Sequence, residues 1–236
     1  MSQTEMTRPL SRREWLLSDA PQTRRQARLG SIYQGWLTFR GNKLAMLGLI
    51  VLIVLIGMAI LAPWIAPQSP FSQNLAGRLQ PPSAAHWLGT DHLGRDIMSR
   101  LIHGSRITLF IVGTVALIAP IIGLFIGTVA GFAGGWVDQV LMRITDIFLA
   151  FPKLILALAF VAALGASIGN AVLALALTAW PPYARLARAE TLTIRNADYI
   201  AAARLQGAGP MRLLIRHIWP LCVSSLIVRV ALDMAG

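Results

Sequence analysis

The chain has 236 residues, of which 56% are apolar and only 13% are charged, and its mean hydropathy is +0.62. A soluble globular protein carries about 25% charged residues, so this composition excludes an ordinary water-soluble domain and indicates a chain embedded in lipid. The 21 lysines and arginines give a net charge of +11, which we assign to membrane orientation and lipid contact rather than to nucleic acid, because the apolar runs leave no soluble surface for groove binding.

The first predicted membrane span covers residues 44–62 and follows a basic N-terminal segment, residues 1–43. The span is nineteen residues without a charge, or about 28 Å of helix, which matches the apolar thickness of a bilayer. Eight lysines and arginines precede it, so the N-terminus is expected on the cytoplasmic side. Residues 63–106 are then expected to form an extracytoplasmic loop.

The second predicted span lies within thirty uncharged residues, Ile107 to Trp136, which open the second region of the chain, residues 107–236. Glycine recurs at every fourth position of this span, at Gly123, Gly127 and Gly131. Such a row lies on one face of a helix and lets another helix approach closely. The alternative is that glycine is simply common in membrane helices.

The third and fourth predicted spans form a hairpin. Residues 154–184 are uncharged but too long for one untilted span. Residues typical of a turn stand in the middle of this run, namely Gly165, Ser167, Gly169 and Asn170. The third span is expected to start upstream, through Ile144 and Phe148, and the fourth to end near Pro181 and Pro182.

A fifth span begins at Leu221 and stops after sixteen residues at Gly236, which indicates a C-terminally truncated chain. Arg229 and Asp233 lie four residues apart in it and therefore share one helix face. Arg229 is nine residues beyond Pro220, roughly 14 Å into the membrane. Because a lone charge in lipid is unfavourable, the two residues form either a structural ion pair or part of a translocation path.

Residues 185–219, the coupling segment, join the fourth and fifth spans and carry six arginines, which places them in the cytoplasm. An alanine-rich stretch runs to Leu205 and is followed by Gly207 and Pro210, residues typical of the end of one helix and the start of the next. The pattern predicts a helix, a tight turn and a short helix, with return to the membrane at Pro220. Such a rigid unit suits force transmission from a soluble partner, and an amphipathic helix held on anionic lipid is the alternative.

The chain offers no motif for catalysis or for a cofactor. Both lysines, Lys43 and Lys153, follow residues other than glycine, so the glycine–lysine pair of a phosphate-binding loop is missing. The single cysteine, Cys222, excludes an internal disulfide and a thiolate zinc cluster. The loop residues that could ligate a metal match no compact ligand spacing; they are His86, His92, His103, Asp91 and Asp96. We therefore expect no catalytic residue, no metal and no cofactor of the chain's own.

The coupling segment also resembles a known loop. Residues 199–207 read YIAAARLQG, and Pro220 follows them. This stretch resembles the "EAA" loop of ABC importer permeases, in which E-A-A is followed by a glycine four residues after the second alanine and then by a proline. Ala201 stands where that family has an acidic residue, whereas the next two alanines and Gly207 match.

Three further stretches resemble the peptide and nickel branch of these permeases. Residues 88–96, LGTDHLGRD, are similar to its GTDxxGRD signature. Residues 39–45 resemble its approach to the first span, and residues 138–152 resemble the start of its third span. From these stretches the chain is identified as a C-type permease of the dipeptide, oligopeptide and nickel family of ABC importers, a family that includes D,D-dipeptide permeases.

The resemblance implies an all-α polytopic membrane protein with the type I ABC importer transmembrane fold, with six spans expected and about five present. It implies a non-enzymatic subunit for peptide uptake across the bacterial inner membrane. The implied partners are a homologous B-type permease subunit, two ATPase subunits that bind the ATP, and an extracytoplasmic substrate-binding protein. The residues expected to dock with an ATPase are Ala201, Ala202, Ala203, Arg204, Gly207, Ala208 and Arg212. A stand-alone secondary transporter or an integral-membrane enzyme is the alternative.

Overall fold

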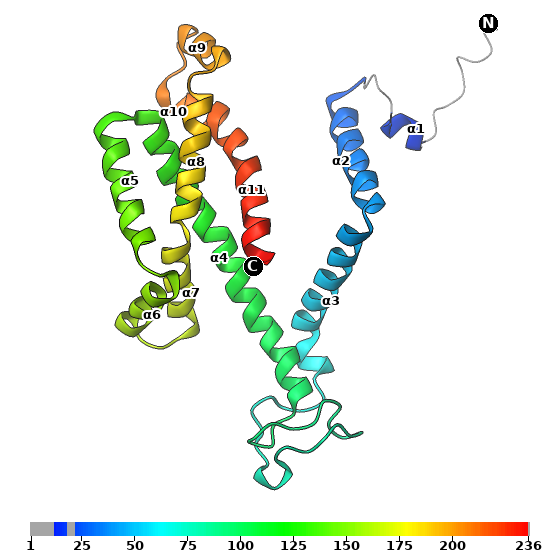
Figure 1. Ribbon diagram of the computed structural model, residues 1–236. Helices are drawn as coiled ribbons and strands as arrows, with labels where there is room; N and C mark the ends of the chain where they lie inside the picture. Colours follow the sequence, from blue (N-terminus) through cyan, green and yellow to red (C-terminus); the bar gives the residue numbers. More distant parts are fainter. Residues whose placement is uncertain (1–11, 18–21, 236) are drawn as a thin grey trace, which may run out of the picture. The chain divides into compact units, whose positions relative to one another are not determined.

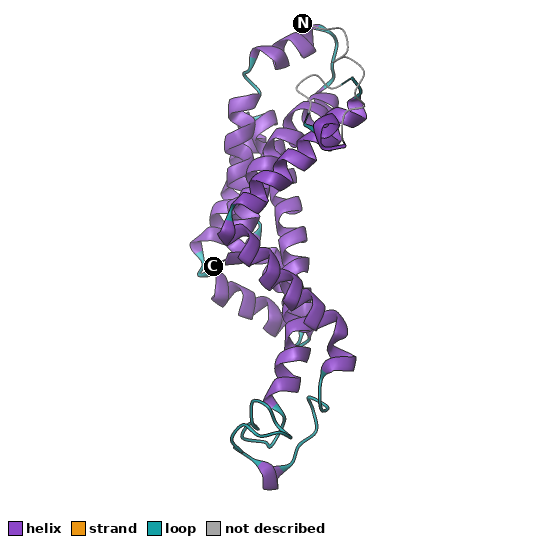
Figure 2. Cartoon of the chain, turned by 90° about the vertical axis from the view of Figure 1, so that its right-hand side faces the viewer, coloured by secondary structure: helices purple, strands orange, loops and turns teal. Residues whose placement is uncertain are grey.

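The computed structural model describes residues 12–17 and 22–235, which form helices joined by short connections and one longer loop (Figure 1, Figure 2). No strand occurs in this part of the chain, and its one β-type pairing is an isolated antiparallel bridge between Thr90 and Asp96. The predicted all-α class is therefore confirmed. Residues 1–11 and 18–21 of the predicted basic segment, including Arg8, lie outside the described residues, as does Gly236.

The chain divides into two compact units that meet inside helix α4, the first ending at Arg106 and the second starting at Ile107. The helices of the first unit are α1 (Arg12–Leu16), α2 (Arg24–Gly41), α3 (Lys43–Ile65) and the short 3-10 turn η2 (Leu75–Gly77). The side chain of Asn42 accepts hydrogen bonds from the amides of Leu44 and Ala45 and so caps the start of α3. Helix α3 contains the predicted span 44–62, and most of its apolar side chains are exposed, as expected of a helix surrounded by lipid.

The second unit packs its helices around α8. It begins with the part of α4 (Ile97–Ala133) that follows Arg106. Its other elements are α5 (Gly135–Ala150), α6 (Lys153–Leu164), α7 (Ile168–Ala179), α8 (Pro181–Ile194), α9 (Asp198–Leu205), α10 (Pro210–Leu213), the π-helical turn η3 (Leu214–Ile218) and α11 (Trp219–Ala235). Helix α8 contacts both α5 and α11. Figure 1 shows α9 and α10 at one end of this unit and the α6–α7 hairpin at the other.

Within residues 12–17 and 22–235, three helical stretches are long and apolar enough to cross a membrane: Lys43–Ile65, Ile97–Ala133 and Pro210–Met234. The predicted third span differs from these because it is broken, with α5 and α6 meeting at 94°. The break falls at Phe151 and Pro152. Proline lacks an amide hydrogen and forces the preceding residue out of the helical region, and Phe151 accordingly has φ −93° and ψ 142°. The sequence predicts Asp146 and Lys153 at the entry of the third span, but Lys153 follows a full helix of sixteen residues and lies after the break.

The predicted hairpin turn between α6 and α7 is present. Gly165 has φ +92°, and the Asn170 side chain donates hydrogen bonds to the carbonyls of Leu164 and Gly165. Ser167 caps α7 by accepting from the Asn170 amide. Each arm has only twelve residues, or about 18 Å, which is shorter than a bilayer core. The fourth apolar stretch instead continues into α8, because Trp180 between α7 and α8 has helical angles and proline is accepted in the first turn of a helix.

The prediction of a separate short helix before Pro220 is wrong. Helix α10 continues through the π-helical turn η3 into α11, so Pro210 to Met234 form one uninterrupted helical stretch. Pro220 is the second residue of α11, one residue after Trp219, which follows η3. A π-helical turn changes the local hydrogen-bond spacing, which explains how the helix passes a residue that has no amide hydrogen.

The predicted glycine row is a packing surface between α4 and α8. A Cβ atom placed on Gly123 would lie 2.4 Å from the Tyr183 Cβ, and one on Gly127 would lie 2.2 Å from the Ala184 carbonyl oxygen. A Cβ on Gly131 would lie 2.8 Å from the Thr191 Cβ. The backbones therefore approach so closely that only glycine fits, which favours the packing interpretation over the compositional alternative.

Candidate functional site

The coupling segment contains a helix end that only glycine adopts easily. Gly207 has φ +82°, the left-handed conformation that its sequence position predicts. The amide of Ala208 donates to the Ala203 carbonyl at 3.0 Å, and the amide of Gly207 donates to the Arg204 carbonyl at 2.9 Å. These two bonds are those of a Schellman motif, which ends α9 and directs the chain into α10.

Two buried side chains anchor this turn in the second unit. Ile200 on α9 is fully buried, and Leu213 on α10 is 2% exposed; both belong to the hydrophobic cluster that includes the α8 residues Ala184 and Ala187. Asp198 lies in the first turn of α9, where a carboxylate is favoured by the helix dipole. The turn is therefore held by the core on one side and projects on the other.

The predicted docking residues divide between these two sides. Five of them are exposed, namely Ala201, Ala202, Arg204, Gly207 and Arg212, while Ala203 and Ala208 are half-buried and pack against the cluster. Arg204 also lies over the Phe132 ring of α4, with its guanidinium carbon 5.8 Å from the ring centroid. The structure thus exposes most of the predicted set but ties Arg204 and two of the alanines to the unit itself.

Sequence reasoning missed the most exposed apolar side chains of this turn. Leu205 is 90% exposed and Met211 is 66% exposed, and Tyr199 at the start of α9 is 47% exposed. We call these three residues the docking tip. Large apolar side chains at a polar end of a protein mark a surface that a partner covers. The clue in the sequence was Leu205 and Met211 on either side of the Gly207 turn, where polar residues are usual.

Polar contacts tie α8 to its neighbours near the coupling segment. Arg188 makes a bidentate ion pair with Asp138 of α5, at 2.5 and 2.6 Å. Arg195, just beyond α8, donates to the Gly131 carbonyl of α4 at 2.7 Å. Glu190 on α8 accepts from Ser225 of α11 at 2.8 Å. A displacement of α8 would therefore be transmitted to three other helices.

A second link joins α11 directly to α4. The indole nitrogen of Trp219 donates to the Thr128 hydroxyl at 3.0 Å, and Thr128 is fully buried. Trp219 follows η3 immediately, at the start of α11. The start of α11 is thus fixed to the middle of the glycine row of α4.

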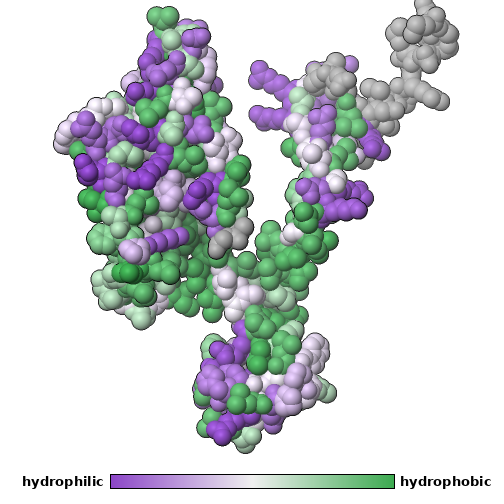
Figure 3. Space-filling view, in the orientation of Figure 1, coloured by the Kyte–Doolittle hydropathy of each residue, from purple (hydrophilic) through white to green (hydrophobic). Residues whose placement is uncertain are grey.

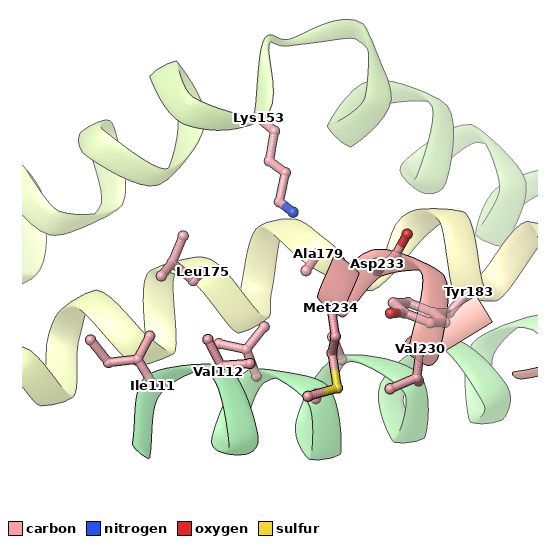
Figure 4. Close-up of a pocket in the computed structure, with 12 residues that line it drawn as sticks. Ile111, Val112, Lys153, Leu175, Ala179, Tyr183, Val230, Asp233 and Met234 are labelled. Atoms are coloured by element: carbon pink, nitrogen blue, oxygen red, sulfur yellow. The ribbon is translucent and has the colours of Figure 1, made fainter. Parts of the chain in front are cut away.

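Arg229 and Asp233 form the i, i+4 ion pair that their spacing predicts, with Arg229 Nε 3.0 Å from Asp233 Oδ1. Their side chains are 44% and 38% exposed. Asp233 also lines a cavity of about 320 Å³, together with Lys153 of α6 and Tyr183 of α8 (Figure 4). Arg229 and Asp233 thus form an ion pair while Asp233 also lines a cavity. A structural ion pair and a place on a translocation path, the two predicted roles, are therefore compatible.

The motif at residues 88–96 builds a compact turn in the first unit. Asp91 accepts hydrogen bonds from the amides of Leu93 and Arg95 and from the guanidinium groups of Arg95 and Arg100. Desolvation raises the pKa of Asp91, but the hydrogen bonds from Arg95 and Leu93 outweigh it and hold the pKa well below its usual range. Gly94 has φ +71°, and a Cβ there would overlap the Asn74 carbonyl oxygen. The charged residues of this motif thus serve the shape of the loop.

Two histidines of residues 63–106, His86 and His103, also make local contacts. His86 Nδ1 lies 3.0 Å from Asp96 Oδ1, and Asp96 is buried and also accepts from the Ser99 amide. His103 Nδ1 lies 3.1 Å from the Ser99 carbonyl oxygen. In residues 12–17 and 22–235 no group of three potential metal ligands gathers.

We expect Asp91→Asn to loosen this loop. An amide group in place of one carboxylate oxygen would face the guanidinium groups of Arg95 and Arg100, so at least one of these contacts is lost. Trypsin should then cut the detergent-solubilised protein at these arginines severalfold faster than the wild type. His92→Asn is the matched control, because His92 is an exposed neighbour in the same turn. Equal cleavage rates for Asp91→Asn and wild type would contradict this account.

The exposed surface of the second unit differs between its two ends (Figure 3). The α6–α7 end exposes large apolar side chains, among them Leu154, Ile155, Leu158 and Ile168. The end with α9 carries hydrophilic residues around the docking tip. This division is typical of a unit with one end in lipid and the other in water.

Comparison with known proteins gives consistent matches over most of the chain. A family model described as "Binding-protein-dependent transport system inner membrane component" matches residues 123–236. A second, described as "N-terminal TM domain of oligopeptide transport permease C", matches residues 32–82. The first includes the glycine row, the coupling segment and the Arg229–Asp233 pair.

Named relatives extend this similarity. The di/tripeptide transport system permease protein of Pseudomonas aeruginosa is 42% identical over 85% of this chain and 68% of its own length. The probable D,D-dipeptide transport system permease protein of Escherichia coli is 38% identical over 93% of this chain and 73% of its own length. The nickel transport system permease protein of Escherichia coli is 41% identical over 80% of this chain and 68% of its own length.

Proposed function

The chain belongs to the family of binding-protein-dependent transport system inner membrane components, and from this premise we propose that it is the C-type permease subunit of an ABC importer for small peptides. In this proposal the chain forms half of a transmembrane pathway in the bacterial inner membrane, and a homologous B-type permease forms the other half. It catalyses no reaction itself. The peptide assignment is supported by the relatives whose names specify dipeptides, tripeptides and oligopeptides.

The observation that carries the proposal is the anchored docking tip. Leu205, Met211 and Tyr199 are exposed on a turn whose conformation is fixed by Gly207 and whose base is buried at Ile200 and Leu213. A partner that covers this tip would bind a preformed shape and lose little freedom on binding. Because the chain has no phosphate-binding loop, we propose that two separate ATPase subunits bind the ATP and that one of them covers the tip.

Transport in this proposal is a rigid-body motion of the second unit. A force on α9 and α10 reaches α11 directly through η3, and it reaches α5 and α4 through the contacts of Arg188 and Arg195. Helices that are linked in this way move together, and interfaces with two stable arrangements turn a small shift into alternating access. ATP binding and release by the partners would thus rock the pathway between its two faces.

The proposed orientation has the N-terminus and the coupling segment in the cytoplasm. It rests on the excess of arginine and lysine before α3 and in residues 185–219. Residues 63–106 then face outward, where an extracytoplasmic substrate-binding protein delivers the peptide. The compact Asp91 turn gives that protein a defined surface to meet.

The proposed function is tested by a substitution that disturbs the left-handed conformation of Gly207. Gly207→Val forces a β-branched residue toward a left-handed conformation that costs about 1–2 kcal/mol or more, so the turn opens and the tip loses its shape. A Cβ at Gly207 contacts nothing within 4 Å in the chain, so the second unit itself should still fold. We expect Gly207→Val to abolish co-purification of the ATPase subunits and peptide uptake.

Gly207→Asn is the matched control, because asparagine accepts the left-handed conformation at helix ends. It should keep both the ATPase subunits and uptake near the wild-type level. Retention of the ATPase by Gly207→Val, or import by the isolated chain without ATP, would refute the proposed function.

A further inference from the structure

A cavity within the second unit has one strongly polar region in an otherwise apolar wall. It measures about 320 Å³, near the lower end of the roughly 300–1,000 Å³ typical of ligand pockets. Its apolar wall comes from α4, α7 and α11, with Val112, Leu175 and Val230 among the side chains. Lys153 and Asp233 supply the charges, and Figure 4 shows the Lys153 side chain directed from α6 toward the wall that carries Ala179 and Asp233.

A second cavity, of about 340 Å³, shares these charged residues with the first. Both are lined by Lys153, Ala179 and Asp233, and the second adds Arg229 and Thr178. Lys153 therefore lines both cavities, in the region that they share, which we call the junction. A small elongated molecule that occupies both cavities would lie beside its ammonium group.

The charges around this junction are not balanced. Asp233 is already paired with Arg229 on its own helix, at 3.0 Å. Among the ion pairs in residues 12–17 and 22–235, none includes Lys153. Two cations and one carboxylate leave the junction with one excess positive charge, and that charge resides on Lys153.

The start of α6 adds to this preference for an anion. Lys153 is the first residue of this twelve-residue helix, and no side chain caps its N-terminus. The first backbone hydrogen bond of the helix is donated by Leu156 to Pro152, so the amides of residues 153–155 have no acceptor within the helix. The helix dipole places further positive potential at the same point. The 94° break at Pro152 is the feature that brings this helix start to the cavity.

We propose that Lys153 binds the C-terminal carboxylate of the transported peptide at the junction of the two cavities. The inference rests on the proposed function as a peptide permease and adds the chemical group that the permease recognises. The apolar walls contact the peptide side chains without selecting them. The pathway thus recognises the terminal charge that all unmodified small peptides share.

The test compares free peptides with their C-terminal amides in the complete importer, reconstituted in proteoliposomes with its partner permease, ATPases and binding protein. The probe is an equimolar mixture of free dipeptides and of the matching dipeptide amides, with the uptake of each measured by mass spectrometry. The binding protein is the same for every variant, so its own preference cancels when the ratio of free to amidated uptake is compared between variants. Co-purification of the ATPases reports assembly.

We expect Lys153→Met to lower the ratio of free to amidated uptake by about tenfold or more, because it removes a charge-assisted hydrogen bond. Lys153→Arg keeps the charge and should keep the ratio. An unchanged ratio in Lys153→Met would overturn the proposal, even where total uptake falls, because it would mean that Lys153 does not distinguish a terminal carboxylate from an amide.

Two further results separate the possible failures. If the wild type imports neither free nor amidated dipeptides, the proposed function fails before the question of Lys153 arises. If Lys153→Met does not assemble, the proposal is tested on the wild-type importer instead. With the binding protein saturated by each probe in turn, free dipeptides must enter faster than dipeptide amides. Equal rates in that measurement would overturn the carboxylate site.

Discussion

Gly127→Val is expected to separate α4 from α8 and to cause the largest loss of stability of any single substitution in the second unit. A Cβ at this position would lie 2.2 Å from the Ala184 carbonyl oxygen and 2.8 Å from the Ala187 Cβ. Both alanines are fully buried, and a main-chain oxygen cannot rotate away as a side chain can. Overpacking a core costs about 1–3 kcal/mol where side chains can adjust, so we expect at least about 3 kcal/mol here.

The measurement is the thermal unfolding midpoint of the detergent-solubilised protein, followed by co-purification of its partners. Gly113→Val is the matched control, since Gly113 lies on the same helix and a Cβ there meets nothing within 4 Å. The control should remain within about 1 kcal/mol of the wild type, the usual range for helix propensity. Similar midpoints for the two variants would show that the row is not a contact surface.

Asp138→Ala is expected to have the second largest effect. The Asp138 and Arg188 side chains are only 16% and 34% exposed, and the pair is bidentate. Removing the carboxylate leaves the Arg188 guanidinium partly buried without its partner, which costs 3–5 kcal/mol for a fully buried pair and about 2 kcal/mol at this exposure. The attachment of α8 to α5 should weaken, so we expect a lower unfolding midpoint and less uptake per ATP hydrolysed.

The same helices offer a control for this substitution. Asp146 of α5 pairs with Arg185 of α8 at 2.6 Å, but the two side chains are 48% and 55% exposed. Exposed pairs contribute about 0–1 kcal/mol, so Asp146→Ala should change the midpoint little. If both variants unfold at the same temperature, burial does not distinguish the two pairs and the transmission route through Arg188 loses its support.

Local features of the fold could be predicted from the sequence. The uncharged runs predict apolar helices, the residues from Gly165 to Asn170 predict the hairpin turn, and Gly207 before Pro210 predicts a left-handed helix end. Each of these depends on the residues next to it. Pro152 is the local signal for the break between α5 and α6, but proline in a membrane helix can also cause only a kink, so the angle of 94° could not be predicted.

Most of what the site depends on is not local. Arg188 and Asp138 are fifty residues apart, and nothing in the sequence pairs them before the helices are packed. The resemblance to the EAA loop gave residues 201–204 as docking candidates, but the exposure of Leu205 and Met211 follows from which face of the turn Ile200 and Leu213 bury. The sequence places Lys153 only near the entry of the third span, because its place in a cavity depends on the break and on α11.

The π-helical turn η3 also determines which side of α11 faces the cavity. An α-helix advances by about 100° per residue, and a π-helical turn is in effect one residue inserted into it. Everything downstream of Ile218 is therefore rotated by about that angle compared with a regular helix. Without the additional residue, the Arg229–Asp233 pair would be turned about a quarter of a circle away from Lys153, although its spacing would be unaltered. The direction in which the Arg229–Asp233 pair points from the helix axis thus depends on η3, which lies some ten residues earlier in the chain.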